Sequence, residues 1–193
     1  MGRLRSILCC IALLGGLYPM SLAGQGRALI VFAQGGGNIP LNNLSKSGDD
    51  FEGSVAGGGG IGLQLGSHYA IRGTVSFVPS KYRGSTLAFS DKDFARTFIG
   101  ADLQLGFPSF GGLAPYFFAG AGSVIIDPDE PGQDSFSKLA GRFGTGINYV
   151  FDNRFTTIFV ELGTWVYRFD RLGFDKGQVD LTISAGLAYA LPF

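Results

Sequence analysis

The final stretch of the chain, from Gln178 to Phe193, alternates strictly between two kinds of side chain. One set is apolar or aromatic and consists of Val179, Leu181, Ile183, Ala185, Leu187, Tyr189, Leu191 and Phe193. The residues between them, from Asp180 to Ala190, are small or polar. Because successive side chains of a strand point to opposite faces, this alternation predicts a β-strand with a different environment on each side.

The same alternation recurs through most of the chain and predicts eight strands. Their ranges are 27–35, 55–66, 69–78, 94–107, 115–126, 139–151, 154–167 and 178–193. Four long polar loops, at 36–53, 79–92, 127–137 and 168–177, alternate with three short turns. The 32 glycines disfavour helices. We therefore predict an all-β fold, an eight-stranded antiparallel up-and-down transmembrane β-barrel, with the long loops outside and the short turns in the periplasm.

Charged residues of the predicted strands share the small, polar face. They are Arg72, Arg96, Asp102, Arg142, Glu161 and Asp180. A cation that faces the middle of a bilayer costs about 2–4 kcal/mol, whereas the three cations and three anions can pair inside a narrow barrel. We expect the three arginines to point inward, and at least one to form a salt bridge with Asp102 or Glu161.

A soluble lipocalin-like barrel is the alternative, with the same alternation turned inside out. That arrangement would place the charged face in water beside a stripe of glycines. The terminal pattern Tyr189-x-Leu191-x-Phe193 has no purpose in a soluble barrel. The sequence therefore favours the membrane barrel.

The N-terminus has the pattern of a secretory signal peptide. Arg3 and Arg5 precede an apolar run over 7–17, of about 11 residues, which is too short for a spanning helix of about 20. Small residues at Ser21 and Ala23 predict cleavage after Ala23. We expect residues 1–23 to be removed and residues 24–193 to form the barrel domain. Both cysteines lie in the removed segment, so the mature chain has no thiol.

The end of the chain also carries a resemblance to a known family. Ser184, Gly186, Tyr189, Leu191 and Phe193 stand at the spacing of the C-terminal assembly signal of bacterial outer-membrane barrels. Nearly the whole mature chain resembles the outer membrane protein β-barrel domain family, which includes OmpX-like proteins and the membrane domain of OmpA. This resemblance implies a Gram-negative outer membrane location, contact with outer-membrane lipid, and recognition by periplasmic chaperones and the barrel assembly machinery.

Patterns that would indicate chemistry are weak. The chain has 15 basic and 15 acidic residues, which argues against a nucleic-acid partner. The loop after Asp127 begins like a calcium loop, but Lys138 occupies the position that requires a glutamate. The glycines at 57, 59 and 62 match a dinucleotide fingerprint inside a strand, where no helix follows. We expect no cofactor, metal or catalytic site.

His68 is the sole histidine and lies in a predicted short turn, without a carboxylate nearby in sequence. We read it as an exposed turn residue. The favoured function is therefore a structural or surface-interaction role, in which the loops bind an extracellular ligand. A narrow pore and a lipid-modifying enzyme that depends on His68 are the alternatives.

Overall fold

The computed structural model describes residues 27–44, 48–84, 93–128, 134–153, 155–170 and 175–192. The predicted signal peptide and Phe193 lie outside these ranges. The described residues form nine strands: β1 (Ala28–Pro40), β2 (Asp50–Phe51), β3 (Ser54–Gln64), β4 (Tyr69–Arg83), β5 (Asp93–Gly106), β6 (Leu113–Pro128), β7 (Phe136–Val150), β8 (Thr156–Phe169) and β9 (Lys176–Pro192). No helix in these ranges is long and apolar enough to cross a membrane.

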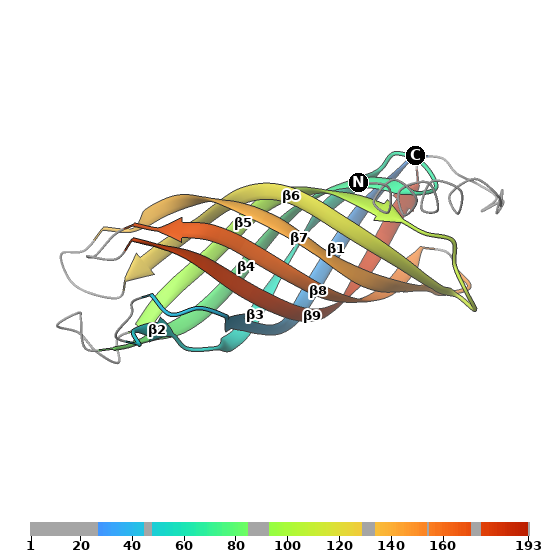
Figure 1. Ribbon diagram of the computed structural model, residues 1–193. Helices are drawn as coiled ribbons and strands as arrows, with labels where there is room; N and C mark the ends of the chain where they lie inside the picture. The colour runs from blue at the N-terminus through green and yellow to red at the C-terminus, as the bar shows by residue number, and fades with distance from the viewer. Residues whose placement is uncertain are drawn as a thin grey trace, which may run out of the picture.

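The eight long strands close into an antiparallel barrel. Each pairs with its neighbours in chain order, and β9 returns to β1 to complete the ring (Figure 1). The closing pair runs from Ala28 opposite Pro192 to Pro40 opposite Asp180. The predicted architecture, an eight-stranded barrel closed by the C-terminal segment against the first, is confirmed.

The strands are longer at the loop end than the alternation in the sequence predicts. The four loops expected to begin at residues 36, 79, 127 and 168 lose their first residues to β1, β4, β6 and β8, which end at Pro40, Arg83, Pro128 and Phe169. These strand ends lack simple apolar alternation, but the ladders continue through them, as between Lys81 and Asp93. The barrel is consequently elongated along its axis (Figure 1).

A β-bulge separates β2 from β3. Gly57 pairs with Phe77, whereas Phe51 pairs with Tyr82, so residues 52–56 face the shorter segment 78–81. Pro79, which has no N–H to donate, stands in that segment of β4. Because one extra residue reverses the facing of the chain beyond it, Phe51 points into the barrel and is 2% exposed.

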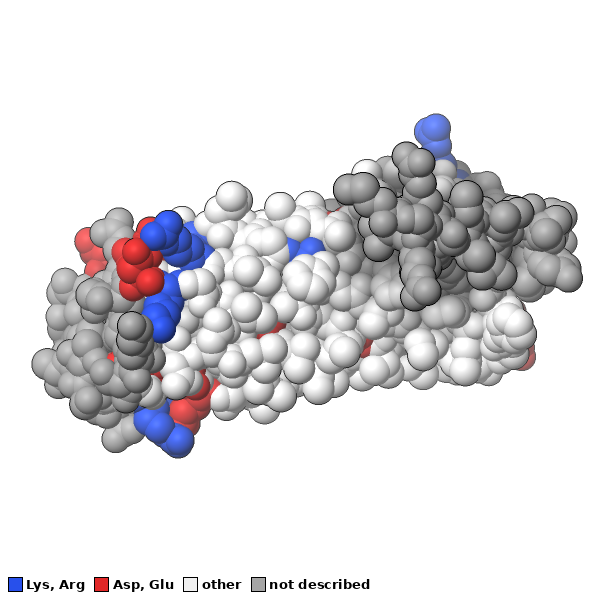
Figure 2. Space-filling model, in the orientation of Figure 1, with Lys and Arg blue, Asp and Glu red and all other residues white. Residues whose placement is uncertain are grey.

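The outward face of the barrel is apolar. Side chains such as Ile61, Phe77, Leu103, Val160 and Leu187 are each about half exposed. Figure 2 shows that the middle of the visible face carries almost no charge, while Lys, Arg, Asp and Glu gather at the loop end. This distribution is opposite to that of a lipocalin-like barrel. It matches a barrel surrounded by lipid.

Exposed aromatic residues of the described ranges form a girdle at the turn end. Its exposed members are Tyr69, Phe107, Phe110, Tyr149, Phe151, Phe155 and Tyr189. Such barrels usually carry a second girdle at the other interface, and the sequence places Phe89, Phe94, Phe136, Tyr167, Phe169 and Phe174 near the predicted outer strand ends. This sequence-based prediction is wrong for the described residues: Phe94, Tyr167 and Phe169 are buried inside the barrel, and Phe136 packs against them. Tyr116, which the sequence places near the turn end, also points inward. Phe89 and Phe174 lie outside the described residues.

Candidate functional site

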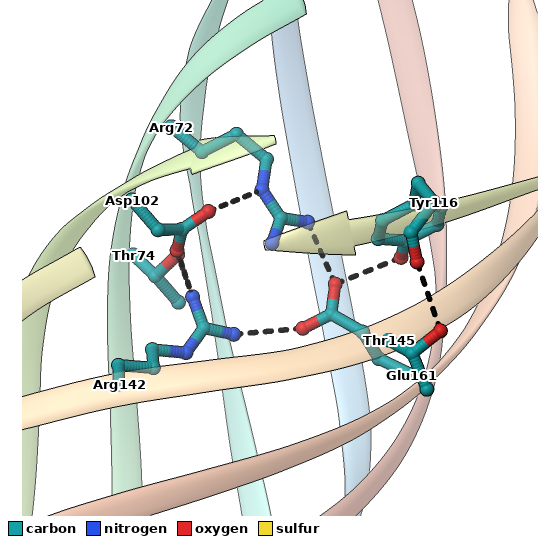
Figure 3. Close-up of polar contacts among 7 residues, drawn as sticks. All are labelled: Arg72, Thr74, Asp102, Tyr116, Arg142, Thr145 and Glu161. Atoms are coloured by element: carbon teal, nitrogen blue, oxygen red, sulfur yellow. Dashed lines mark hydrogen bonds and ion pairs between the residues drawn. The ribbon is translucent and has the colours of Figure 1, made fainter. Parts of the chain in front are cut away.

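Four charged residues form a closed ring of ion pairs across the barrel interior (Figure 3). Arg72 Nε lies 2.9 Å from Asp102 Oδ1, and Arg72 Nη1 lies 2.6 Å from Glu161 Oε2. Arg142 contacts the other oxygen of each carboxylate: Asp102 Oδ2 through Nη1, and Glu161 Oε1 through Nη2 at 2.7 Å. Each cation therefore bridges both anions. We call these four residues the ion-pair ring.

The ion-pair ring spans the barrel because its members come from opposite walls. In the circular strand order, β4 and β8 lie four positions apart, which is half the circumference. Arg72 on β4 reaches Glu161 on β8 across this diameter, and Arg142 on β7 reaches Asp102 on β5. All four side chains are at most 6% exposed. The interior is thus crossed by a neutral, buried layer of charge.

Aromatic rings and hydroxyls surround the ion-pair ring. The Tyr116 hydroxyl donates to Glu161 Oε2 at 2.9 Å, and Arg142 donates to Thr74 Oγ1 at 3.2 Å. Phe118 lies beside both guanidinium groups, with its centroid 5.0 Å from Arg72 Cζ and 4.5 Å from Arg142 Cζ. Cation–π attraction is strengthened where water is excluded, so these rings stabilise the charges that they enclose.

A second buried layer lies closer to the loop end. Arg96 is fully buried and donates to Asp180 Oδ2 at 2.8 Å and to Asn38 Oδ1 at 2.7 Å. Tyr167 donates to the same carboxylate oxygen at 3.1 Å. Strands β5 and β9, which supply Arg96 and Asp180, also face each other across the barrel. The six residues selected from the sequence therefore occupy two stacked layers, four in one and two in the other.

Residues of the β1–β3 connection cover the second layer and close the loop end. Leu44 and Phe51 are buried, and the Tyr82 hydroxyl donates to Asp49 Oδ1 at 2.6 Å. The ring of Phe51 lies 4.8 Å from Arg96 Cζ and packs edge-on against Phe94 and Phe169. We call Leu44, Asp49 and Phe51 the mouth cap. The bulge before β3 is what turns Phe51 inward to complete it.

Glycines of the inner face provide space for these aromatic side chains. A Cβ at Gly144 would stand 2.5 Å from Phe118 Cζ, and one at Gly100 would stand 2.7 Å from Trp165. Gly186 lies in the same way against Phe159. Aromatic rings that pack over glycines of neighbouring strands are a known device of curved sheets. The abundant glycine of the sequence therefore accommodates aromatic rings as well as the arginines.

The turn end contains an open cavity of about 250 Å³, which we call the vestibule. Its floor includes Arg72 and Tyr116, at the edge of the ion-pair ring, and its mouth lies among turn residues such as Gly66 and Ser109. Small side chains, including Ala70, make room for it. The vestibule thus reaches the ion-pair ring from the turn end, whereas the mouth cap covers the other end.

The remaining predicted residues are placed as follows. Ser184 and Gly186 lie on the inner face of β9, and Tyr189 and Leu191 are exposed on its outer face. His68 is exposed in the turn before β4, with its Nδ1 2.6 Å from Ser67 Oγ.

The described residues contain no group of three metal-ligating side chains. Both carboxylates of the ion-pair ring accept hydrogen bonds from two arginines.

Tyr116, Tyr167 and Asn38 also bind the charged residues, although the charge pattern of the sequence does not indicate them. A usable signal was present for the two tyrosines. Tyr167 has the same strand parity as Glu161, and Tyr116 has that of Gly120 and Gly122. Both belong to the inward face by the rule that assigns the charges inward.

Solved structures share this fold at low sequence identity. Neisserial surface protein A matches with a TM-score of 0.67 and 14% identity over 86% of this chain and 99% of that one. The N-terminal β-barrel domain of OprF from Pseudomonas aeruginosa gives 0.56 and 18%, over 88% and 100%. Ail, the attachment invasion locus protein of Yersinia pestis, gives 0.53 and 14%, over 87% and 100%.

These similarities define the fold class. The chain has the fold of the small eight-stranded outer-membrane β-barrels, as the resemblance in its sequence indicates. No protein-family model and no curated protein sequence matches it.

Proposed function

We propose that this protein is a closed outer-membrane β-barrel of a Gram-negative bacterium, with a structural or surface-interaction role and no catalytic activity. The observation that carries the proposal is the distribution of charge. The surface around the barrel is apolar, and six charged side chains are paired inside it. A barrel that spans a membrane needs an apolar outer surface. Paired charges that fill the interior would explain a barrel that does not conduct ions.

Two features support a closed barrel over a narrow pore. Ion pairs join opposite walls at two levels, and the mouth cap buries Leu44 and Phe51 above them. Ions would have to break the buried pairs to pass, and removing one partner of such a pair typically costs about 3–5 kcal/mol. Planar-bilayer recording of the refolded protein should show no steady single-channel current. A stable open level would instead favour the pore.

The proposed orientation places the loop connections outside the cell and the turns in the periplasm. The loops are the surface through which an extracellular ligand would bind, and the apolar surface contacts outer-membrane lipid. Outward-facing Tyr189 and Leu191, with Phe193, would present the signal that the assembly machinery reads. The proposal thus adds to the fold an outer-membrane location and three kinds of partner: lipid, an extracellular ligand and the assembly machinery.

Protease treatment of intact cells tests the orientation and the location together. Cleavage should occur in the connections between β4 and β5, between β6 and β7 or between β8 and β9, while the turn at residues 107–112 is protected until the outer membrane is permeabilised. The protein should also sediment with the outer-membrane fraction. Recovery from the soluble periplasmic fraction, or cleavage of the turns in intact cells, would contradict the proposal.

A lipid-modifying activity has a separate test. His68→Ala removes the imidazole that such an enzyme would need. We expect lipid A acylation to be identical in cells that express the two forms. Dependence on His68 would overturn the assignment of a non-enzymatic role.

A further inference from the structure

The vestibule carries an inference beyond a closed structural barrel. Its wall bears three side-chain amides, from Gln64, Gln104 and Asn148, on alternate strands of the barrel. Gln104 and Asn148 are half-buried, and neither side-chain amide has a hydrogen bond within the described part of the chain. Each amide offers donors and an acceptor to whatever occupies the cavity. The wall is therefore equipped to pair with amide or hydroxyl groups of a ligand.

The floor of the vestibule presents one guanidinium group, from Arg72, beside aromatic rings. Arg72 is the sole Lys or Arg in the lining, and no Asp or Glu lines it. The Arg72 side chain is 6% exposed, and its Nη2 has no partner among the described residues, although Nε and Nη1 are paired. Phe32 and Phe159 lie next to it as an edge-to-face pair with centroids 6.0 Å apart. The floor therefore suits an anionic group next to an apolar one.

The cavity is large enough for a small organic molecule. Its volume of about 250 Å³ is several times the share of one water in the liquid, ~30 Å³, and approaches the smallest ligand pockets. The ion-pair ring closes the cavity above Arg72, so a ligand would enter and leave through the turn end. This geometry describes a binding pocket and not a passage.

We propose that the vestibule binds a small peptide-like carboxylate, a molecule that combines an amide, an apolar side group and a free carboxylate. The carboxylate lies toward Arg72, the apolar group packs on Phe32 and Phe159, and the amide pairs with Gln104 or Asn148. Each of the three ligand groups thus has a matching group in the cavity.

N-acetylphenylalanine is a suitable probe because it carries all three groups. The refolded barrel in lipid nanodiscs is titrated with it, and the side-chain amide resonances of Gln104 and Asn148 are followed by NMR. We expect saturable shifts. The neutral probe N-acetylphenylalanine amide should bind about tenfold more weakly, because it lacks the charge-assisted contact.

Two variants locate the site. Ala188→Leu places a larger side chain in the vestibule and should abolish the shifts. Gln178→Leu removes a buried amide at the other end of β9, outside the vestibule, and should leave them unchanged. Heat-modifiable mobility on gels confirms that both variants are folded.

Three outcomes would overturn the inference: no saturable shift, equal binding by Ala188→Leu, or equal affinity for the neutral probe. Because the titration uses purified protein, its result does not depend on the cellular location tested above.

Discussion

At the scale of single residues, this barrel is organised by arginines that each satisfy two acidic partners. Arg72 and Arg142 share both Asp102 and Glu161, so each carboxylate oxygen of the pair is occupied. Such a ring is neutral as a whole, but the loss of one member leaves an unbalanced charge in a site that is almost fully buried. Removing one member of the ion-pair ring should therefore lower the free energy of unfolding strongly.

Glu161→Gln tests this dependence. The substitution keeps the size of the side chain and leaves two buried arginines with one carboxylate, so we expect a loss of about 3–5 kcal/mol in the free energy of unfolding. Urea titration in lipid vesicles, followed by Trp165 fluorescence, measures it. Asp175→Asn is the matched control, because Asp175 pairs with Arg168 in an exposed ion pair. Equal effects of the two substitutions would contradict a stabilising ring.

Asp50, beside the mouth cap, gives a pH-dependent prediction. Burial, the largest cause, and the charge of Asp180 raise the pKa of Asp50 above its ordinary value, despite the opposing effects of the Phe51 N–H and Arg96. Because the folded-state pKa is the higher one, the contribution of Asp50 to stability is present in acid and is lost as pH rises through it. Asp50→Asn should therefore stabilise the protein at neutral pH.

The gain from Asp50→Asn should disappear below about pH 4, where the carboxyl is protonated in both states. Unfolding midpoints across the pH range measure this. Asp175 has the opposite sign, because its hydrogen bond with Arg168 lowers its pKa. The stability that Asp175 provides is present above its unfolded pKa and is lost as pH falls. If Asp50→Asn still stabilised the protein in acid, the ionisation of Asp50 could not be the cause of the gain in stability.

At the scale of strands, the glycines of the inner face determine where aromatic rings can lie. On β7, Gly144 faces inward and Gly141 faces outward. A Cβ on Gly144 would meet the Leu162 carbonyl oxygen and the Phe118 ring, whereas a Cβ on Gly141 would meet nothing within 4 Å. The two positions are therefore a matched pair on one strand.

Gly144→Ala should destabilise the barrel by about 1–3 kcal/mol, the usual cost of overpacking, because the new Cβ would meet the Leu162 carbonyl oxygen and the Phe118 ring, which packs on both arginines of the ion-pair ring. Gly141→Ala should have little effect. Unfolding in lipid vesicles compares them. If both substitutions cost the same, β-propensity and not contact with Phe118 would explain the glycines.

The sequence was sufficient to predict the strands and the face on which most side chains lie. Residues two apart in a strand share a face, so each inward charged residue also assigns its neighbours along the strand. It failed where pairing, rather than alternation, extends a strand, as from Pro79 to Arg83. It also could not locate the bulge that turns Phe51 inward, since the register between β2 and β4 is a property of two segments. The burial of the loop-end aromatic residues could have been predicted, because Phe94 has the strand parity of Arg96 and Phe169 has that of Glu161.

At the scale of the whole molecule, the barrel separates an apolar exterior from a polar, self-neutralised interior. Two charged layers and the mouth cap fill the loop half, while the vestibule leaves the turn half open. The vestibule was not predicted, because its volume arises from small residues on many strands that are distant in sequence. The asymmetry follows from the loop-end aromatics, which point inward and occupy the lumen.

The single tryptophan permits a direct test of which face meets lipid. Trp165 lies inside the barrel and is 2% exposed, whereas Val160 on the same strand is 54% exposed on the outer face. The native protein and the variant Trp165→Phe/Val160→Trp are refolded into vesicles of brominated lipid, and quenching of tryptophan fluorescence is compared. We expect strong quenching of the variant and weak quenching of native Trp165. Stronger quenching of Trp165 would place the charged face against the lipid and contradict the proposed topology.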